Sequence, residues 1–307
     1  MKGAKSVILK VLIVIAIIVI VLMSAALLYL PKIVMTGKRQ TLEEARAWQS
    51  ERIDISYYDG LEKADYIVKG YNDYELHVEF LKNPEDTDKY IILSHGYTDN
   101  RIGSLKYAKM YLDLGFNCII YDLRGHGLNE STYTTYGILE AQDLMAIIKD
   151  TRERYDSISF FGIHGESLGA ATTITSLKYK PEVDFAVADC GFSDIYNVLY
   201  EGYKNAHVPT FLVDIASIGA KLRYGYSLKE MRPIDSLTDN TIPILFIHGG
   251  DDNFILPKNS EDMAKASKGM TELHIIEGAA HAYSIFTDPV KYKEYVGKFL
   301  DRCEGEH

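Results

Sequence analysis

The stretch Ser157–Thr173, SISFFGIHGESLGAATT, places the strongest constraint on what this chain can fold into. A short apolar run typical of a buried strand leads into Gly165-Glu166-Ser167-Leu168-Gly169, and small residues that favour a helix follow. Glycines two positions before and after a serine form the G-x-S-x-G pattern of a sharp strand-to-helix turn, where larger side chains would clash. Such a turn holds the Ser167 hydroxyl clear of the backbone, beside a helix N-terminus that favours negative charge. The alternative is a tight turn that carries an ordinary hydroxyl.

Strand and helix patterns alternate along the chain from residue 64 onward. Strands are expected at 64–69, 74–81, 89–93, 117–121, 158–163, 185–189, 242–248 and 272–277, and helices at 102–114, 137–155 and 289–301. Strands separated by helices are typical of a parallel sheet built from crossover units, and the first two strands are close enough to pair antiparallel at one edge. The sequence therefore predicts an α/β fold with a mostly parallel, twisted sheet flanked by helices.

Residues 190–240 interrupt this alternation. The insertion of about 50 residues is too long for an ordinary loop and too apolar to be exposed. It is rich in tyrosine and contains Pro209 and several glycines. We interpret it as a small cap of two or three short helices over the carboxyl edge of the sheet.

The N-terminal segment Val11–Leu30 contains no charged residue. Twenty helical residues cover roughly 30 Å, the thickness of a bilayer core. Lys2, Lys5 and Lys10 precede the segment. A signal peptide cut after Ser24-Ala25-Ala26 is an alternative, but the apolar run is longer than the usual apolar region of a signal peptide, which favours an uncleaved transmembrane anchor.

The domain organisation follows from this anchor. We expect a transmembrane anchor at 1–35, a juxtamembrane segment at 36–55 and the α/β domain at 56–307. Thr41 and Glu44 form a capping-box pattern that starts a short helix, which we interpret as a stalk. A short basic tail before a first span usually stays in the cytoplasm, which would put the domain outside, although basic residues after the span nearly balance that tail.

Composition excludes several classes of function. The chain carries 33 basic and 43 acidic residues, a net charge of −10, which argues against a nucleic-acid-binding surface. Neither phosphate-binding glycine motif occurs at a strand-to-helix turn, so a nucleotide-binding protein is discarded. The cysteines Cys118, Cys190 and Cys303 lack metal-ligand spacing, and the first two are expected to be buried. No cofactor and no metal ion are expected.

A serine hydroxyl needs a base to remove its proton, and the base needs an acid to orient it. In a parallel sheet both belong in loops at the carboxyl ends of later strands. The loop after the strand at 242–248 offers Asp251 and Asp252, and His281 follows the last strand. Of the nine histidines, His281 is the best base, because most of the others lie within strands or beside glycine at strand ends. A surface-loop histidine is the alternative.

Backbone N–H groups are the expected stabilisers of an oxyanion, because they point at the charge without rearranging. Leu168 directly follows the serine and supplies one such group. Tyr97, in the loop after the strand at 89–93, supplies the other. Asn100 nearby is interpreted as a helix cap.

The motifs together resemble the α/β-hydrolase superfamily. The matching residues are His95-Gly96-Tyr97, Asp122-Leu123-Arg124-Gly125-His126-Gly127, Gly165-Glu166-Ser167-Leu168-Gly169-Ala170-Ala171-Thr172, His248-Gly249-Gly250-Asp251-Asp252 and His281. Within the superfamily the chain is similar to membrane-anchored bacterial serine hydrolases of the esterase and serine-aminopeptidase-like kind. The resemblance implies that the acid is Asp252, the fifth residue of H-G-x-x-D, and that Asp122 and Arg124 are structural.

The function predicted from sequence is that of a serine hydrolase with a triad of Ser167, Asp252 and His281 and an acyl-enzyme intermediate. We expect carboxylic esters of small-to-medium acyl groups as substrates, since a tyrosine-lined cap suits compact molecules with polar groups. A serine peptidase of the aminopeptidase-like kind is the first alternative. A non-catalytic binding protein on the same fold is the second, because fold does not fix function.

Overall fold

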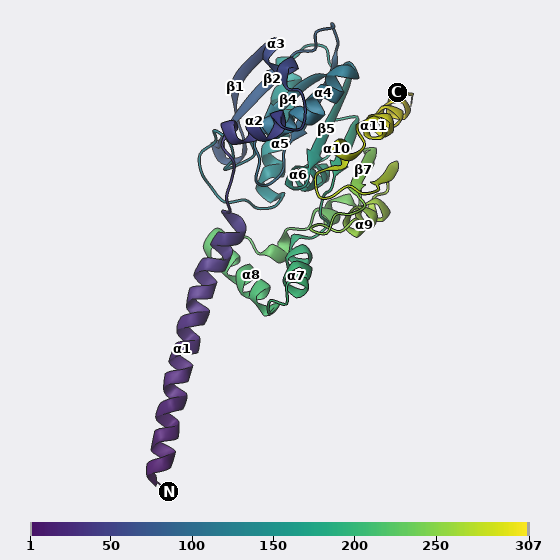
Figure 1. Ribbon diagram of the computed structural model, residues 1–307. Coiled ribbons are helices and arrows are strands. Elements are labelled where there is room, and N and C mark those ends of the chain that lie inside the picture. The colour runs from purple at the N-terminus through teal and green to yellow at the C-terminus, as the bar shows by residue number, and fades with distance from the viewer. Residues whose placement is uncertain (1, 306–307) are drawn as a thin grey trace.

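One sheet of eight strands runs through the domain in the computed structural model, which describes residues 2–305 (Figure 1). The strands are β1 (Lys63–Lys69), β2 (Glu75–Leu81), β3 (Lys89–Ser94), β4 (Asn117–Tyr121), β5 (Phe160–Glu166), β6 (Phe185–Asp189), β7 (Ile244–Gly249) and β8 (Thr271–Ile276). Their order across the sheet is β1-β2-β4-β3-β5-β6-β7-β8. β2 pairs antiparallel with β1 and β4, and the other pairs are parallel. The predicted sheet, mostly parallel with an antiparallel edge, is confirmed.

Helices cover both faces of this sheet. The domain helices are α2 (Leu42–Ser50), α3 (Ser56–Gly60), α4 (Leu105–Asp113), α5 (Ile138–Arg154), α6 (Leu168–Ser176), α7 (Ile195–Asn205), α8 (Phe211–Tyr224), α9 (Lys258–Ala266), α10 (Ser284–Thr287) and α11 (Pro289–Gly305). Side chains of α5, α6 and α9 pack on one face of the sheet, and side chains of α2, α4 and α11 pack on the other. The helices expected at 102–114, 137–155 and 289–301 therefore exist, although the first begins as a 3-10 turn, Arg101–Ser104.

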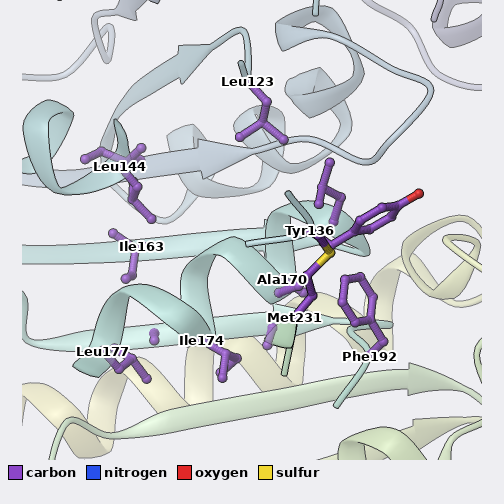
Figure 2. Close-up of a cluster of buried hydrophobic side chains, with 14 of the residues drawn as sticks. Leu123, Tyr136, Leu144, Ile163, Ala170, Ile174, Leu177, Phe192 and Met231 are labelled. Carbon is purple, nitrogen blue, oxygen red and sulfur yellow. The ribbon is translucent and has the colours of Figure 1, made fainter. Parts of the chain in front are cut away.

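The alternation of side chains along the inner strands produces two hydrophobic cores. In β3, Ile92 faces the core under α5 and α6, whereas Ile91 and Leu93 face the core under α4 and α11. Such strands are apolar throughout because helices bury both of their faces. Figure 2 shows part of the first core, where Leu144 of α5 and Ile174 of α6 lie over the sheet.

The insertion forms the expected helical cap. It consists of α7 and α8, followed by the short 3-10 turns Leu228–Glu230 and Pro233–Leu237. Asp194 caps α7 by accepting the Asn197 N–H at 3.2 Å, and Gly225 ends α8 with a left-handed φ of 82°. The cap lies at the end of the domain from which the N-terminal helix projects (Figure 1).

That N-terminal helix, α1 (Lys2–Met35), is long and apolar enough to cross a membrane. Its apolar side chains from Val7 to Leu22 are exposed, but near its C-terminal end the helix packs against α8. A side chain at Gly219 of α8 would clash with the Leu27 carbonyl and with Pro31, so glycine allows this close approach. Met35, the last residue of α1, is fully buried in the domain core.

The juxtamembrane segment packs on the domain rather than forming a free stalk, so that part of the sequence interpretation is wrong. The predicted capping box of Thr41 and Glu44 is present and starts α2. Gln49 of α2 is buried and donates to the Gly103 carbonyl at 3.1 Å. Trp48 packs edge-on against the rings of Tyr283 and Phe286. The boundaries at residues 35 and 55 stay a prediction.

Candidate active site

The carboxyl ends of the parallel strands meet at one edge of the sheet, and the predicted elbow lies there between β5 and α6. Ser167 has φ 53° and ψ −110°, a strained conformation for a residue with a side chain. A Cβ atom at Gly165 would lie 2.0 Å from the Gly169 carbonyl oxygen, and one at Gly169 would lie 2.0 Å from that of Ser94. Both glycines are therefore required by close backbone contacts, as the sequence pattern predicts.

The three residues proposed from sequence as a triad lie in one hydrogen-bonded row. His281 Nε2 is 3.0 Å from Ser167 Oγ, and His281 Nδ1 is 2.6 Å from Asp252 Oδ2. Asp252 lies in the loop after β7, and His281 lies in the loop after β8. Asp251 is exposed, and its backbone N–H donates to the Ala279 carbonyl at 2.9 Å. The geometry thus favours Asp252 over Asp251 as the partner of His281.

The Asp252 carboxylate is buried but fully surrounded by hydrogen-bond donors. Its Oδ1 accepts the backbone N–H groups of Phe254 and Ile255, each at 2.9 Å. His248 Nε2 lies 3.2 Å from Oδ2. Burial raises the pKa of Asp252, but the hydrogen bonds from His248 and His281 outweigh it and hold that pKa well below its usual value. The carboxylate therefore stays charged and fixes the orientation of the histidine ring.

Sequence reasoning missed the contact of His248 with Asp252, because it set His248 aside as a histidine beside glycine at a strand end. His248 Nε2 is 2.7 Å from the Ile255 carbonyl, and its Nδ1 is 2.7 Å from Ser260 Oγ. The histidine therefore also ties the loop after β7 to α9. The spacing of four residues indicates a contact only on a helix, so the turn after β7, which brings Asp252 back to His248, was not predictable from it.

The histidines at the ends of earlier strands have structural partners. His95 Nε2 accepts the Leu123 N–H at 2.9 Å, and its Nδ1 therefore donates to the Gly96 carbonyl at 2.7 Å. His126 Nε2 bonds the Tyr97 carbonyl at 2.6 Å. Burial lowers the pKa of His95, His126 and His164 to about 3, so all three rings stay neutral. The rings of His95 and His126 brace the loop that carries Tyr97, whereas His164 Nδ1 lies 3.1 Å from the Tyr111 hydroxyl in the core.

The end of α1 also braces this loop. The Tyr97 hydroxyl donates to the Val34 carbonyl at 2.9 Å and accepts the Gly37 N–H at 2.8 Å. The Tyr97 ring stacks on Tyr136 with 5.6 Å between ring centroids. The backbone N–H groups expected to stabilise an oxyanion belong to Tyr97 and Leu168. Tyr97 lies in the turn after β3, and Leu168 is the first residue of α6, so its N–H has no acceptor within the helix. Asn100 caps the following turn by accepting the Ile102 N–H, as expected.

A cleft of about 540 Å³ opens over Ser167, a volume within the range of small-molecule sites. Its lining is mostly apolar. The side chains that form its walls include Ile33 and Val34 of α1, Trp48 of α2, Ile195, Leu199 and Tyr203 of α7, and Phe254 and Tyr283 of the loops after β7 and β8. The participation of α1 and α2 was missed, because no local pattern shows that residues before the first strand fold back over the sheet.

Charged side chains line one part of the cleft beside Ser167. Lys106 of α4 is buried and forms an ion pair with Glu166, the residue before the serine. The Tyr107 hydroxyl is 2.6 Å from Glu166 Oε2 and 2.9 Å from Asp189 Oδ2. Burial raises the pKa of Asp99, which also lines the cleft, to about 6. In the sequence Glu166 fills only a variable position of the G-x-S-x-G pattern, so sequence reasoning did not find this group of charges.

Within residues 2–305 no group of histidine, cysteine, aspartate or glutamate side chains is arranged to hold a metal ion. The three cysteines form no disulfide among residues 2–305 and are buried, and burial was expected for the first two. Burial raises the pKa of the Cys190 thiol well above its usual value, so it has no thiolate character.

Comparisons with known proteins identify the family of the chain. Residues 103–307, 205 of the 307 residues, match the model of the prolyl oligopeptidase family. The uncharacterized protein YqkD of Bacillus subtilis (strain 168) is 34% identical over 251 residues, which cover 80% of this chain and 81% of YqkD. The fold and the serine elbow define an α/β-hydrolase, and the chain belongs to the prolyl oligopeptidase family.

Solved structures with this fold include both esterases and peptidases. The Pyrococcus furiosus esterase Pf2001 superposes with a TM-score of 0.68 at 25% identity, over 81% of this chain and 95% of the esterase. A Mycobacterium tuberculosis puromycin-hydrolyzing peptidase superposes with a TM-score of 0.63 at 17% identity, which shows the fold alone. It matches 82% of this chain but only 40% of the peptidase. The family and these neighbours support a serine hydrolase as the class of enzyme.

Proposed function

We propose that the protein hydrolyses carboxylic esters of small-to-medium acyl groups, with Ser167 as nucleophile, His281 as general base and acid, and Asp252 as the orienting acid. The observation that carries this proposal is the row of hydrogen bonds from Ser167 Oγ to His281 Nε2 at 3.0 Å and from His281 Nδ1 to Asp252 Oδ2 at 2.6 Å. This is the arrangement that activates a serine hydroxyl.

The reaction follows from the atoms in this row. Ser167 Oγ attacks the ester carbonyl while its proton passes to His281 Nε2. The charge of Asp252 stabilises the resulting imidazolium, and the N–H groups of Tyr97 and Leu168 donate to the carbonyl oxygen as it becomes negative. His281 then gives the proton to the leaving alcohol, which leaves an acyl group on Ser167. A water molecule, deprotonated by His281, releases the acid and restores the serine.

Two observations favour an ester over a peptide. The match with the esterase Pf2001 covers nearly the full length of that esterase. The match with the puromycin-hydrolyzing peptidase leaves more than half of the peptidase chain unmatched. The cleft is mostly apolar and of a size that suits one compact acyl group rather than a triglyceride. The observation that favours the peptidase alternative is the pair of carboxyl groups of Asp99 and Glu166, which lie where a substrate ammonium group would be attracted.

A substrate panel tests this choice. The full-length protein is assayed with p-nitrophenyl esters of graded acyl length and with aminoacyl p-nitroanilides. Each methylene that the cleft buries contributes roughly 0.8 kcal/mol, so kcat/KM is expected to rise about fourfold per carbon and then fall when the cleft is full. A steady rise to long chains would favour a lipase, and anilides cleaved faster than every ester would favour the peptidase.

We further propose that α1 anchors the protein in a membrane with the domain on the outer side. A carbonate wash is expected to leave the full-length protein in the membrane fraction, and protease added outside is expected to reach the domain. A mature protein that begins at Leu27 would instead identify a signal peptide. Leu27 and Pro31 contact α8, and Ile33 and Val34 line the cleft, so both forms keep the end of α1 that lines the cleft.

A further inference from the structure

We propose that the outer face of the cap lies in the lipid headgroup region beside α1, and that the cleft takes a single-chain amphiphilic ester of a small-to-medium acyl group from the bilayer. The partner that covers this face is the membrane surface. The inference rests on the proposed anchoring by α1 and the proposed ester hydrolysis, and it adds the source and the class of the substrate.

The outer face of α8 presents large apolar side chains to solvent. Phe211, Ile218 and Leu222 are 55%, 55% and 77% exposed. Their spacing of seven and four residues puts them on one stripe of the helix. Val208, in the loop between α7 and α8, is exposed as well. We call these four residues the cap stripe. A stripe of this kind on a soluble surface marks an interaction site, and an amphipathic helix is a common means of lying in a membrane interface.

The cap stripe lies next to the contact between α8 and α1. Gly219 marks that contact, and at 3.6 residues per turn the stripe is roughly 60–100° around the helix from it. The partners of Gly219 on α1 are Leu27 and Pro31, which lie at the C-terminal end of the uncharged run. If α1 spans the bilayer, α8 is therefore at the level where the hydrocarbon core meets the headgroups.

Figure 1 shows the direction in which the cap projects. The loop between α7 and α8 is the part of the domain that lies farthest along α1 toward its N-terminal end. This loop carries Val208, and Phe211 directly begins α8. The exposed cations Lys32 and Arg223 lie near the contact of Gly219 with Pro31, since Lys32 follows Pro31 and Arg223 is about one turn beyond Gly219, and anionic lipid headgroups would attract both. The cap stripe and the exposed apolar side chains of α1 thus lie on the same side of the domain, the side from which α1 projects.

The cleft extends to α1 and to the cap on this side of the domain. Ile33 of α1 lines the cleft and is also 65% exposed. Leu199 and Tyr203 line the cleft from α7, the other helix of the cap. An ester whose acyl chain lies in the bilayer can therefore pass along an apolar wall to Ser167 while its polar part stays at the interface. The apolar wall at this end and the polar groups of Asp99 and Lys106 in the same cleft fit an amphiphile with one chain.

Labelled cysteine variants of the full chain test the position of the cap stripe. The three native cysteines are buried, so a thiol-reactive fluorophore will label an added cysteine selectively. Leu222→Cys is compared with Val290→Cys, because Val290 is also 77% exposed but lies in α11, far from α1 in the view of Figure 1. Both variants are reconstituted in vesicles of phosphatidylcholine and phosphatidylglycerol.

In these vesicles a nitroxide on the lipid acyl chain should quench the label at position 222 on the order of fivefold more than the label at 290, and aqueous iodide should show the reverse. Equal quenching of both positions by iodide would overturn the proposal. Protection of position 222 from iodide without quenching by the lipid nitroxide would also overturn it, because a protein would then cover the stripe.

A double variant, Ile218→Asn with Leu222→Asn, tests the source of the substrate. With the full chain in vesicles, hydrolysis of a vesicle-bound single-chain ester should fall about tenfold, while hydrolysis of a water-soluble acetate ester and fluorophosphonate labelling stay within twofold of the parent. The matched control Val290→Asn should change neither. Equal rates on the vesicle-bound ester would overturn the inference, whereas absence of fluorophosphonate labelling in the parent protein would overturn the proposed hydrolase instead.

Discussion

The replacement of Asp252 by asparagine tests the geometry of the site in detail. In the structure Oδ1 accepts two backbone N–H groups, from Phe254 and Ile255, and Oδ2 faces His281 Nδ1 at 2.6 Å. An asparagine keeps the two backbone bonds only if its oxygen takes the Oδ1 position. Its NH₂ group then faces His281 Nδ1, which must act as the acceptor. The proton is forced onto Nε2, the atom that has to receive the proton of Ser167.

The expected loss is large because the histidine is held in the wrong tautomer. A loss of this kind costs about 10⁴-fold in kcat, or ~5.4 kcal/mol at 1.36 kcal/mol per factor of ten. Asp251 is the matched control, since it is the adjacent carboxylate and is exposed. Asp251→Asn should reduce kcat by no more than about threefold, as expected for a surface change away from the reacting atoms.

The assay is the hydrolysis of a short-chain p-nitrophenyl ester at pH 8, with circular dichroism to show that both variants are folded. The rate of fluorophosphonate labelling gives a second, substrate-independent measure of nucleophile activation. Equal losses for the two variants, or a greater loss for Asp251→Asn, would refute the assignment of Asp252.

Three further changes have defined outcomes. Gly169→Ala should lower the free energy of unfolding by on the order of 3 kcal/mol, because the added Cβ would lie 2.0 Å from a backbone oxygen. Gly202 has open space around it, so Gly202→Ala should change the free energy of unfolding by no more than ~1 kcal/mol. Urea unfolding measures both values. Lys106→Met should lower the free energy of unfolding by ~3–5 kcal/mol, because it leaves the buried Glu166 carboxylate without its cation. A second change, Glu166→Gln, should restore part of that loss in the same urea measurement. The pKa of Asp252 is lower in the folded than in the unfolded chain, so its charge stabilises the fold fully above about pH 4 and progressively less as the pH falls further. The Tm difference between the wild type and Asp252→Asn should therefore narrow below that pH. A constant difference in Tm would contradict this.

The fold was predictable from sequence because its signals are local and regular. The strands at the centre of the sheet are apolar runs bounded by glycine and aspartate, and the burial of both faces explains why those runs are continuous. The elbow was predictable because Gly165 and Gly169 are each required by a backbone contact near 2.0 Å. Asp252 and His281 were predictable because each follows a strand whose carboxyl end must lie at the same edge of the sheet.

The rest of the site depends on contacts between residues far apart in sequence. Val34 and Gly37 reach the Tyr97 hydroxyl across about sixty positions, and nothing in their local sequence indicates a hydrogen bond there. Lys106 reads as an ordinary cation on an amphipathic helix, but the fold buries it against Glu166. The interpretation of α2 as a stalk is wrong for the same reason. Contacts with distant residues, such as the hydrogen bond of Gln49 with Gly103, hold α2 on the domain, and the local sequence does not indicate them.

The most direct test of the account is the covalent labelling of Ser167. The full-length protein is treated with a fluorophosphonate, and intact mass and peptide mapping identify the modified residue. We expect one adduct per chain, on Ser167, and no adduct on a folded Ser167→Ala variant. The kcat of this variant should fall by about 10⁴-fold or more. Undiminished labelling of Ser167→Ala, or an adduct on another residue of the active wild type, would contradict the central claim.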